Sequence, residues 1–363
     1  MAAEGRPVGL WHRFLAAALR GVYFGRVRVT GQLPQGARPK LVVSSHRNGA
    51  IDGFQVLAAF PRAQFLISYQ LLRSPVLRAL FTGIPVVRAK DVDRYGMRRD
   101  AVRDPVEASV NHLRSGGDLA IFPEGTSRFG HQPQQYHRGA ARTALKLSQL
   151  QVPFDVVPVG LFYSAPERFR SVAEVRCGPP VEIPSRSGED DGDWELRIHQ
   201  VIGCALDAVS VNCPDEGTFL RVQESAVARA RAGESLAESF LEGQQTEKQA
   251  SAARTHTDAE DETVGPKPPR AAAVRTGRGV VRGIGLVLMA AAAPVLVAGW
   301  FAGTRADARN TVTFFRMLGG LAGFLLWAPV LILTAVLWPA ATSIAAGAAV
   351  LGWLLLGVRR FRP

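Results

Sequence analysis

The chain has 363 residues and a formal charge of +12, from 43 Lys and Arg against 31 Asp and Glu. It is longer than one average domain, and its apolar residues concentrate near the C-terminus behind a polar stretch, which excludes a single uniform soluble domain and a wholly disordered chain. The cysteines (Cys177, Cys204 and Cys213) are few and not in C-x-x-C spacing, which argues against a disulfide framework or a zinc ribbon.

Residues 1–29 are expected to form an amphipathic helix. Apolar side chains recur at helical spacing between Val8 and Phe24, and Arg13 and Arg20 lie among them. These charges interrupt the apolar stretch, so the segment does not read as a secretory signal peptide. Two interpretations stay open: a helix in a membrane interface, and an ordinary helix packed on the next domain.

Residues 30–241 are predicted to form an α/β domain, with a mixed, largely parallel sheet flanked by helices. Buried strands are indicated by short apolar, β-branched runs at Leu41–Ser44, Gln64–Ser68, Pro85–Arg88, Leu119–Phe122 and Val156–Phe162. Helical patterns alternate with them, at Gly53–Phe60, Arg73–Phe81, Val102–Ser115 and Gly139–Leu150. The segment Trp194–Ala232 is expected to be helical in parts.

Residues 242–282 are predicted to be a disordered linker, because this stretch is polar and has no apolar period. Residues 283–363 are predicted to be a membrane region, since Gly283–Thr304 and Met317–Val358 carry no charge. A helix over the second stretch would be about twice as long as a ~30 Å hydrocarbon core. We therefore expect two C-terminal spanning helices, at about 317–337 and 340–358, after a re-entrant hairpin at 283–304 kinked at Pro294. This arrangement keeps the flanking arginine clusters in the cytoplasm.

Two motifs with polar, chemistry-bearing side chains follow predicted strands. The first is Ser44-Ser45-His46-Arg47-Asn48-Gly49-Ala50-Ile51-Asp52, and a His beside a carboxylate is the standard pair for general-base work. The second is Phe122-Pro123-Glu124-Gly125-Thr126-Ser127-Arg128, which offers a tight Gly turn, hydroxyls and a guanidinium fork for phosphate. Taken singly, the first could be a His that caps a helix, and the second a Gly turn with solvated charges.

Two further blocks complete a set of four: Gly83–Arg88, in which a strand ends in Arg88, and the strand Val156–Gly160. In this order and spacing, the four blocks resemble the glycerophospholipid acyltransferase superfamily over about residues 30 to 185. The resemblance implies acyl transfer from an acyl thioester, acyl-CoA or acyl-ACP, to a glycerol hydroxyl, without a bound cofactor. It implies catalytic roles for His46 and Asp52. Substrate-binding roles are implied for Asn48, Arg88, Glu124, Gly125, Thr126 and Arg128.

The spacing of the first block departs from the commonest family pattern, which has four residues between His and Asp. Here five residues separate His46 from Asp52, which on a regular helix would turn the carboxylate by about 100°. The pairing therefore requires a non-helical turn, expected at Asn48-Gly49. Three features resemble fungal-type glycerol-3-phosphate or dihydroxyacetone-phosphate acyltransferases: the longer His46–Asp52 block, the segment Leu206–Arg221 and the C-terminal apolar hairpin. The second motif instead has the lysophosphatidate-type form, so the acceptor stays open between a glycerol phosphate and its monoacyl derivative.

The sequence fits other classes of function less well. The basic residues are not gathered into one helix and no nucleic-acid fold is readable, so the charge is attributed to anionic lipid headgroups and a phosphate-bearing substrate. The histidines are dispersed, and no metal site is expected. A thioesterase or lipase and a non-catalytic lipid-binding membrane tether remain as alternatives. The expected location is the membrane, with the catalytic domain on the cytoplasmic face.

Overall fold

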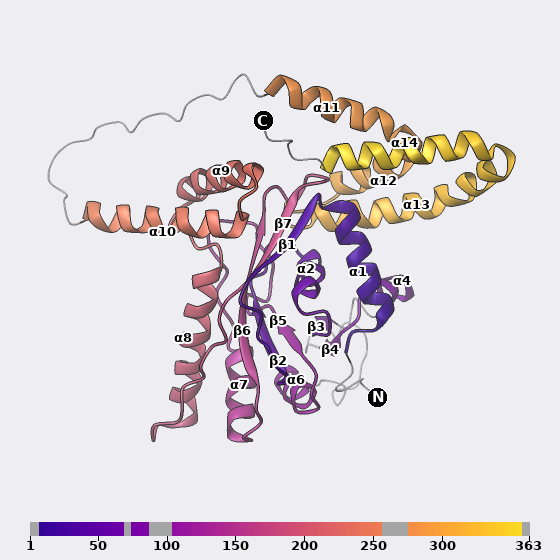
Figure 1. Cartoon of the computed structure of the whole chain (residues 1–363). Coiled ribbons are helices and arrows are strands. Elements are labelled where there is room, and N and C mark those ends of the chain that lie inside the picture. The colour runs from indigo at the N-terminus through magenta and orange to yellow at the C-terminus, as the bar shows by residue number, and fades with distance from the viewer. Residues whose placement is uncertain (1–6, 69–73, 87–103, 256–274, 358–363) are drawn as a thin grey trace.

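The structure is a computed structural model that describes residues 7–68, 74–86, 104–255 and 275–357 (Figure 1). Within these ranges one sheet has the strand order β1-β7-β6-β2-β5-β3-β4. Neighbouring strands are parallel except β6 and β7, which are antiparallel. The strands are β1 (Arg26–Gly31), β2 (Lys40–Ser44), β3 (Gln64–Ser68), β4 (Ile84–Val86), β5 (Leu119–Ile121), β6 (Asp155–Tyr163) and β7 (Val172–Cys177). The predicted mixed, largely parallel sheet is confirmed.

Helices cover both faces of this sheet. Successive side chains of a strand point to opposite faces, so a strand that is apolar throughout has apolar side chains to bury on both. In β2, Val42 packs into the core with α1 (Leu10–Tyr23) and α2 (Ile51–Ala59). Its neighbours Leu41 and Val43 pack into the core on the other face. That face is covered by α6 (Pro105–Arg114), α7 (Gly139–Gln149) and α8 (Asp191–Val209), while the short α4 (Pro75–Leu80) lies beside α1. The strands that precede the two motifs, β2 and β5, are therefore covered by helices on both faces.

Two strands were not predicted, and both contain charged side chains. In β1, Arg26 and Arg28 alternate with valines, and their guanidinium groups donate to main-chain carbonyls at the end of α9 (Glu216–Ala232). In β7, the buried Glu174 accepts hydrogen bonds from the start of α10 (Leu236–Thr255). The interleaved charges hide the strand pattern, and contacts with distant helices explain why they are tolerated.

The expected disordered linker from residue 242 is not what the structure has over residues 242–255, which belong to α10. Leu236, Ala237 and Phe240 anchor the first turns of α10 in a core shared with α9. Farther along, Ala, Glu, Gln and Lys have high helix propensity and extend the helix without an apolar period. Residues 256–274 of the expected linker lie outside the described residues, and its last residues, 275–282, are also helical, in α11 (Arg275–Leu288).

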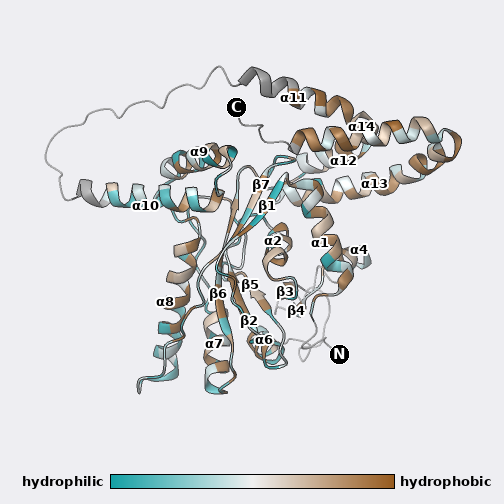
Figure 2. Ribbon diagram, in the orientation of Figure 1, coloured by the Kyte–Doolittle hydropathy of each residue, from teal (hydrophilic) through white to brown (hydrophobic). Residues whose placement is uncertain are grey.

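The C-terminal region contains α11 (Arg275–Leu288), a short 3₁₀ turn (Ala290–Ala292), α12 (Ala293–Thr304), α13 (Val312–Leu337) and α14 (Pro339–Gly357). Two helices among the described residues, Val312–Leu337 and Pro339–Leu356, are long and apolar enough to cross a membrane. The break between them falls at Trp338, as predicted, and α13 begins earlier than predicted, at Val312. Figure 2 shows apolar residues concentrated in this region and polar residues in α9 and α10.

The helices of this region approach closely at glycines. A Cβ on Gly319 of α13 would lie 2.3 Å from the Cβ of Ala302 in α12, and a Cβ on Gly352 of α14 would lie 2.4 Å from the carbonyl oxygen of Gly285 in α11. Small residues allow such backbone contact between helices in lipid. The stretch expected to be kinked at Pro294 is divided just before that residue, where the 3₁₀ turn separates α11 from α12.

Candidate functional site

His46 and Asp52 form a hydrogen-bonded pair where β2 leads into α2. The His46 Nδ1 atom lies 2.8 Å from Asp52 Oδ2. The imidazole stacks on the Phe122 ring, with centroids 4.3 Å apart, and its side chain is 17% exposed while that of Asp52 is fully buried. Because Nδ1 faces a carboxylate, it carries the proton, and Nε2 is left as the basic nitrogen.

The five-residue spacing is accommodated by a non-helical turn, as expected. Gly49 adopts a left-handed backbone with φ +57°, and α2 does not begin until Ile51. The main-chain N–H groups of Arg47 and Asn48 both donate to Asp52 Oδ2, at 2.6 and 2.7 Å. The carboxylate also lies in the first turn of α2, where the helix dipole favours negative charge. The turn therefore both orients Asp52 and offsets the cost of burying it.

Tyr163, which was not predicted as a site residue, completes the surroundings of Asp52. Its hydroxyl donates to Asp52 Oδ1 at 2.5 Å from the end of β6. Burial, followed by the nearby Asp52 charge, raises the pKa of Tyr163 well above its usual value, so the hydroxyl stays a donor. Nothing in the sequence pairs these residues, which are 111 positions apart.

Glu124 is buried beneath the His46 turn, whereas the resemblance implied that it binds substrate. Its side chain is 3% exposed. One carboxylate oxygen accepts the main-chain N–H of His46 at 2.7 Å, and the other accepts that of Gln134 at 2.8 Å. Burial raises the pKa of Glu124 despite these two bonds. Glu124 therefore joins the His46 turn to the second motif.

Arg47 is a buried cation next to these two carboxylates. Its guanidinium carbon lies 4.8 Å from the Phe129 ring centre and 5.7 Å from that of Phe219. Burial lowers its pKa to about 10, and the charges of Glu124 and Asp52 oppose that shift. The group therefore remains charged at neutral pH and balances part of the buried negative charge.

The remaining predicted site residues differ in their exposure. Gly125, Thr126 and Arg128 are exposed beside the pair, and the main-chain N–H of Arg128 donates to the His46 carbonyl at 3.0 Å. Gly125 has φ +66°, which explains the glycine at this turn. Asn48 is fully buried. Arg88 lies outside the described residues.

A loop from the C-terminal region contacts both motifs. The Asn310 side-chain amide, between α12 and α13, donates to the carbonyl oxygen of Ser127 at 2.8 Å and to its hydroxyl at 2.6 Å. A Cβ on Gly49 would lie 3.1 Å from the Asn310 carbonyl oxygen. Asn310 was not predicted as a site residue, because it lies between two apolar stretches far along the chain.

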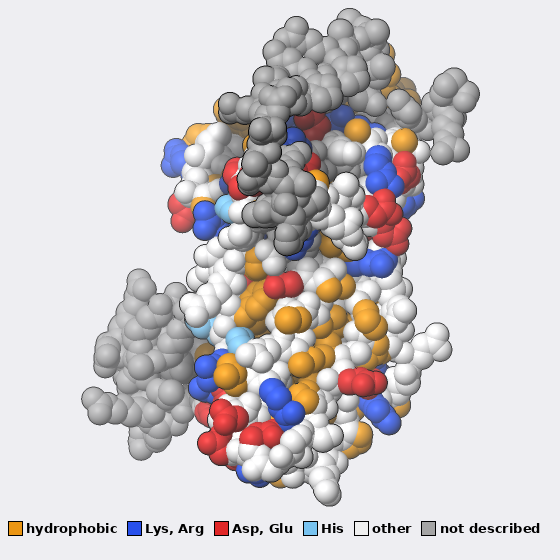
Figure 3. Space-filling view, turned by 90° about the vertical axis from the view of Figure 1, so that its left-hand side faces the viewer, with side chains coloured by type: hydrophobic (Ala, Val, Ile, Leu, Met, Phe, Trp, Pro, Cys, Tyr) orange, Lys and Arg blue, Asp and Glu red, His pale blue; other side chains and the backbone are white. Residues whose placement is uncertain are grey.

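This arrangement can take a proton from a hydroxyl group at His46 Nε2 and hold the resulting imidazolium against Asp52. The Arg128 side chain, whose main chain contacts His46, is exposed and can bind an anion. No group of three or more His, Cys, Asp or Glu side chains suited to a metal occurs among the described residues. On the face seen in Figure 3, acidic and basic side chains are interspersed and do not form one basic patch.

Comparison with known proteins finds similarity to acyltransferases over the part of the chain that holds this site. The Acyltransferase family model matches residues 26–161, which contain both motifs. Glycerol-3-phosphate O-acyltransferase 1 of Saccharomyces cerevisiae is 28% identical over 163 residues, and the match covers 43% of this chain and 20% of that protein. Glycerol-3-phosphate O-acyltransferase 2 of the same yeast is 27% identical over 161 residues, covering 43% of this chain and 21% of that protein.

A solved structure also resembles the chain. The crystal structure of the 1-acyl-sn-glycerophosphate (LPA) acyltransferase PlsC from Thermotoga maritima matches with a TM-score of 0.39 and 18% sequence identity. That match covers 54% of this chain and 76% of the bacterial one. The chain spans only about a fifth of the length of the two yeast relatives.

Proposed function

This chain belongs to the glycerophospholipid acyltransferase superfamily, with features of the fungal glycerol-3-phosphate acyltransferases, and we propose that it transfers a fatty acyl group from an acyl thioester to a hydroxyl of a glycerol-phosphate acceptor. The observation that carries the proposal is the pair His46–Asp52, with Nδ1 at 2.8 Å from a fully buried carboxylate and a partly exposed imidazole. The acceptor is either glycerol 3-phosphate (or dihydroxyacetone phosphate) or its 1-acyl derivative.

In the proposed reaction, His46 Nε2 removes the proton of the acceptor hydroxyl as its oxygen attacks the thioester carbonyl carbon. Asp52 stabilises the imidazolium that forms. The C–S bond then breaks, and the imidazolium returns the proton to the thiolate that leaves. The donor thiol is that of coenzyme A or of an acyl carrier protein, and no residue of the chain is acylated. Arg128, exposed beside the pair, holds the acceptor phosphate, together with Arg88.

The two acceptors have different support. The second motif has the lysophosphatidate-type form, which favours the monoacyl acceptor. Two curated relatives, each matched over 43% of the chain, are named glycerol-3-phosphate O-acyltransferases, which favours the smaller acceptor. We also propose an integral membrane location through α13 and α14, with the catalytic domain on the cytoplasmic face.

The test is acyl transfer by the purified full-length chain with labelled acyl-CoA or acyl carrier protein. The acceptor panel contains glycerol 3-phosphate, dihydroxyacetone phosphate, lysophosphatidate and a neutral lysolipid. His46→Ala should abolish product, whereas the matched control His199→Ala, on α8 at the other face of the sheet, should leave the rate unchanged. Release of free fatty acid with every acceptor would indicate a thioesterase, and no product with either donor would favour a non-catalytic tether.

A further inference from the structure

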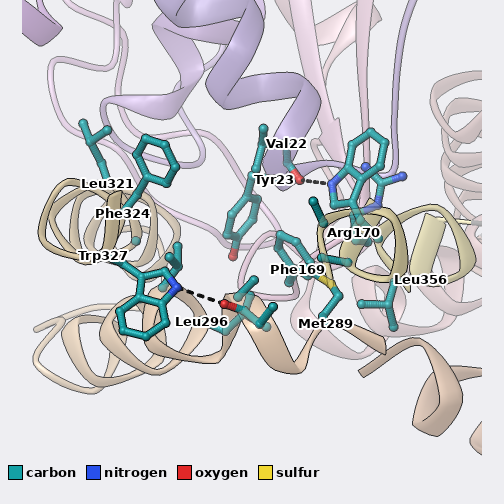
Figure 4. Close-up of a pocket in the computed structure, with 18 of the residues that line it drawn as sticks. Val22, Tyr23, Phe169, Arg170, Met289, Leu296, Leu321, Phe324, Trp327 and Leu356 are labelled. Carbon is teal, nitrogen blue, oxygen red and sulfur yellow. Dashed lines mark hydrogen bonds between the residues drawn. The ribbon is translucent and has the colours of Figure 1, made fainter. Parts of the chain in front are cut away.

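A large apolar cavity lies between α1 and the C-terminal helices (Figure 4). Its volume is about 1700 Å³, which exceeds the roughly 300–1,000 Å³ typical of small-molecule pockets. Its walls are mainly aliphatic and aromatic, including Trp11 and Phe14 of α1, Phe324 and Trp327 of α13, and Trp353 of α14. Such a cavity has the size and chemistry for long hydrocarbon chains.

A second, polar cavity of about 300 Å³ adjoins the first. Four arginines line it, and they come from three separate parts of the chain: Arg168 and Arg170 from the β6–β7 loop, Arg231 from α9, and Arg309 from the α12–α13 loop. The acidic residue in its lining is Glu167, whose carboxylate pairs with Arg309 at 3.4 Å. The lining therefore has an excess of positive charge.

The two cavities meet at shared residues. Phe169, Arg170 and Arg231 line both of them. The Arg170 guanidinium lies 3.9 Å from the ring centre of Trp353 and donates to the carbonyl oxygens of Gly21 and Phe24. One end of the apolar cavity therefore lies next to the arginine cluster.

Two polar groups near the polar cavity are buried and have no hydrogen-bond partner among the described residues. Ser171, which lines the polar cavity, is 6% exposed, and its hydroxyl has no hydrogen-bond partner in the described part of the chain. The Arg170 Nε atom is also buried without a partner there. Unpaired buried donors are costly, so the described residues leave polar groups of the Arg170–Ser171 segment unsatisfied beside this cavity.

We propose that these adjoining cavities form a binding site for an anionic glycerophospholipid of the membrane. The phosphate lies among Arg168, Arg170, Arg231 and Arg309, where guanidinium forks suit phosphate oxygens. The acyl chains lie in the apolar cavity. Neither lining includes His46, Asp52 or Arg128, so lipid binding here can be measured without the acyl-transfer reaction.

The test is lipid binding by the purified full-length chain in a neutral detergent, followed by tryptophan fluorescence and thermal stability. The probes are phosphatidic acid, phosphatidylglycerol, phosphatidylcholine and inorganic phosphate. We expect the two anionic lipids to bind at least tenfold more tightly than phosphatidylcholine and to raise the melting temperature. Equal binding of phosphatidylcholine, or an equal response to inorganic phosphate alone, would overturn the assignment to an anionic lipid.

Variants separate the two parts of the site. Arg168→Gln combined with Arg231→Gln should weaken anionic lipid binding at least tenfold, whereas the matched control Arg142→Gln on α7 should not change it. Ala345→Phe, which narrows the apolar cavity from α14, should weaken the long-chain lipids while circular dichroism stays unchanged. If the double variant fails to fold, the cavity variant still tests the proposal, and undiminished binding in it would refute the placement of the chains.

Discussion

Asp52→Asn separates the charge of this carboxylate from its hydrogen bonds. In the structure, Oδ2 accepts three N–H groups, from His46 Nδ1 and the main chains of Arg47 and Asn48, while Oδ1 accepts the Tyr163 hydroxyl. Two main-chain donors cannot face an amide NH₂, so the oxygen of the new Asn must take the Oδ2 position. The NH₂ then faces Tyr163, whose hydroxyl can turn and accept.

The hydrogen-bond count sets the expected stability. Asp52→Asn keeps an acceptor for the two main-chain N–H groups and a partner for the Tyr163 oxygen, so its melting temperature should stay much closer to that of the wild type than that of Asp52→Ala does. Asp52→Ala leaves the N–H groups of Arg47 and Asn48 and the Tyr163 hydroxyl without this acceptor. At about 1–3 kcal/mol for each buried unsatisfied group, this loss approaches the roughly 5–15 kcal/mol stability of a whole domain. Asp52→Ala should therefore be strongly destabilised.

The activity of Asp52→Asn should fall because the negative charge beside His46 is lost. The amide oxygen still accepts from His46 Nδ1, so Nε2 remains the basic nitrogen, but the imidazolium loses its negative partner. We expect a roughly 10²–10³-fold lower kcat, comparable with removing one preorganised electrostatic group, and a residual rate above that of His46→Ala. The measurements are initial rates of acyl transfer and thermal unfolding of the full-length variants in detergent.

Three outcomes would refute this reasoning. A wild-type rate in Asp52→Asn would mean that the carboxylate charge does not support the reaction. A rate as low as that of His46→Ala, with an unchanged melting temperature, would mean that the amide has turned its NH₂ toward His46. A melting temperature as low as that of Asp52→Ala would mean that the main-chain donors do not set the orientation.

The remaining predictions concern neighbouring groups. Asn310→Ala removes two hydrogen bonds to the second motif and should lower kcat about tenfold with little change in melting temperature, whereas an unchanged rate would show that the loop contact does not position the motif. Burial raises the pKa of both Cys177 and Cys213 to about 11, so at pH 7.5 N-ethylmaleimide should label only the exposed Cys204 of the folded chain, as peptide mass spectrometry would report. Burial raises the pKa of Glu124 above its ordinary value of 4.5, so ionisation of this carboxyl opposes folding. The melting temperature of the wild type relative to that of Glu124→Gln should therefore fall as the pH rises above about 4.5. A wild-type melting temperature that instead rises relative to that of the variant would contradict this.

The fold was predictable where local pattern and tertiary environment agree. The buried strands β2, β3, β5 and β6 consist mainly of apolar residues, so their positions could be read directly from the sequence. Strands β1 and β7 were not predicted, because their charged residues Arg28 and Glu174 are stabilised by α9 and α10, which lie far away in the sequence. The helix over residues 242–255 was not predicted, because α10 is extended by residues of high helix propensity and not by an apolar face.

Only the part of the site that lies within short sequence motifs could be predicted. His46 and Asp52 lie six positions apart, and the motif brings them together through one turn. Tyr163 and Asn310 meet the same motifs only through the packing of β6 and of the C-terminal helices, which no local pattern encodes. Glu124 shows a different limit: its motif indicated importance for the site, but its direction, toward two main-chain N–H groups, depends on how the two loops pack.

The contacts of the C-terminal region bear on how the reaction centre meets the membrane. A flexible linker alone would leave the catalytic domain free to move relative to α13 and α14. Instead, Thr313 and Arg316, in the first turns of α13, donate to the carbonyl oxygens of Pro166 and Glu167, while Asn310 contacts the second motif. If α13 spans the membrane as proposed, its docked first turns hold His46 close to the bilayer surface. An acceptor or product with an acyl chain can then reach the site while its chain remains in lipid.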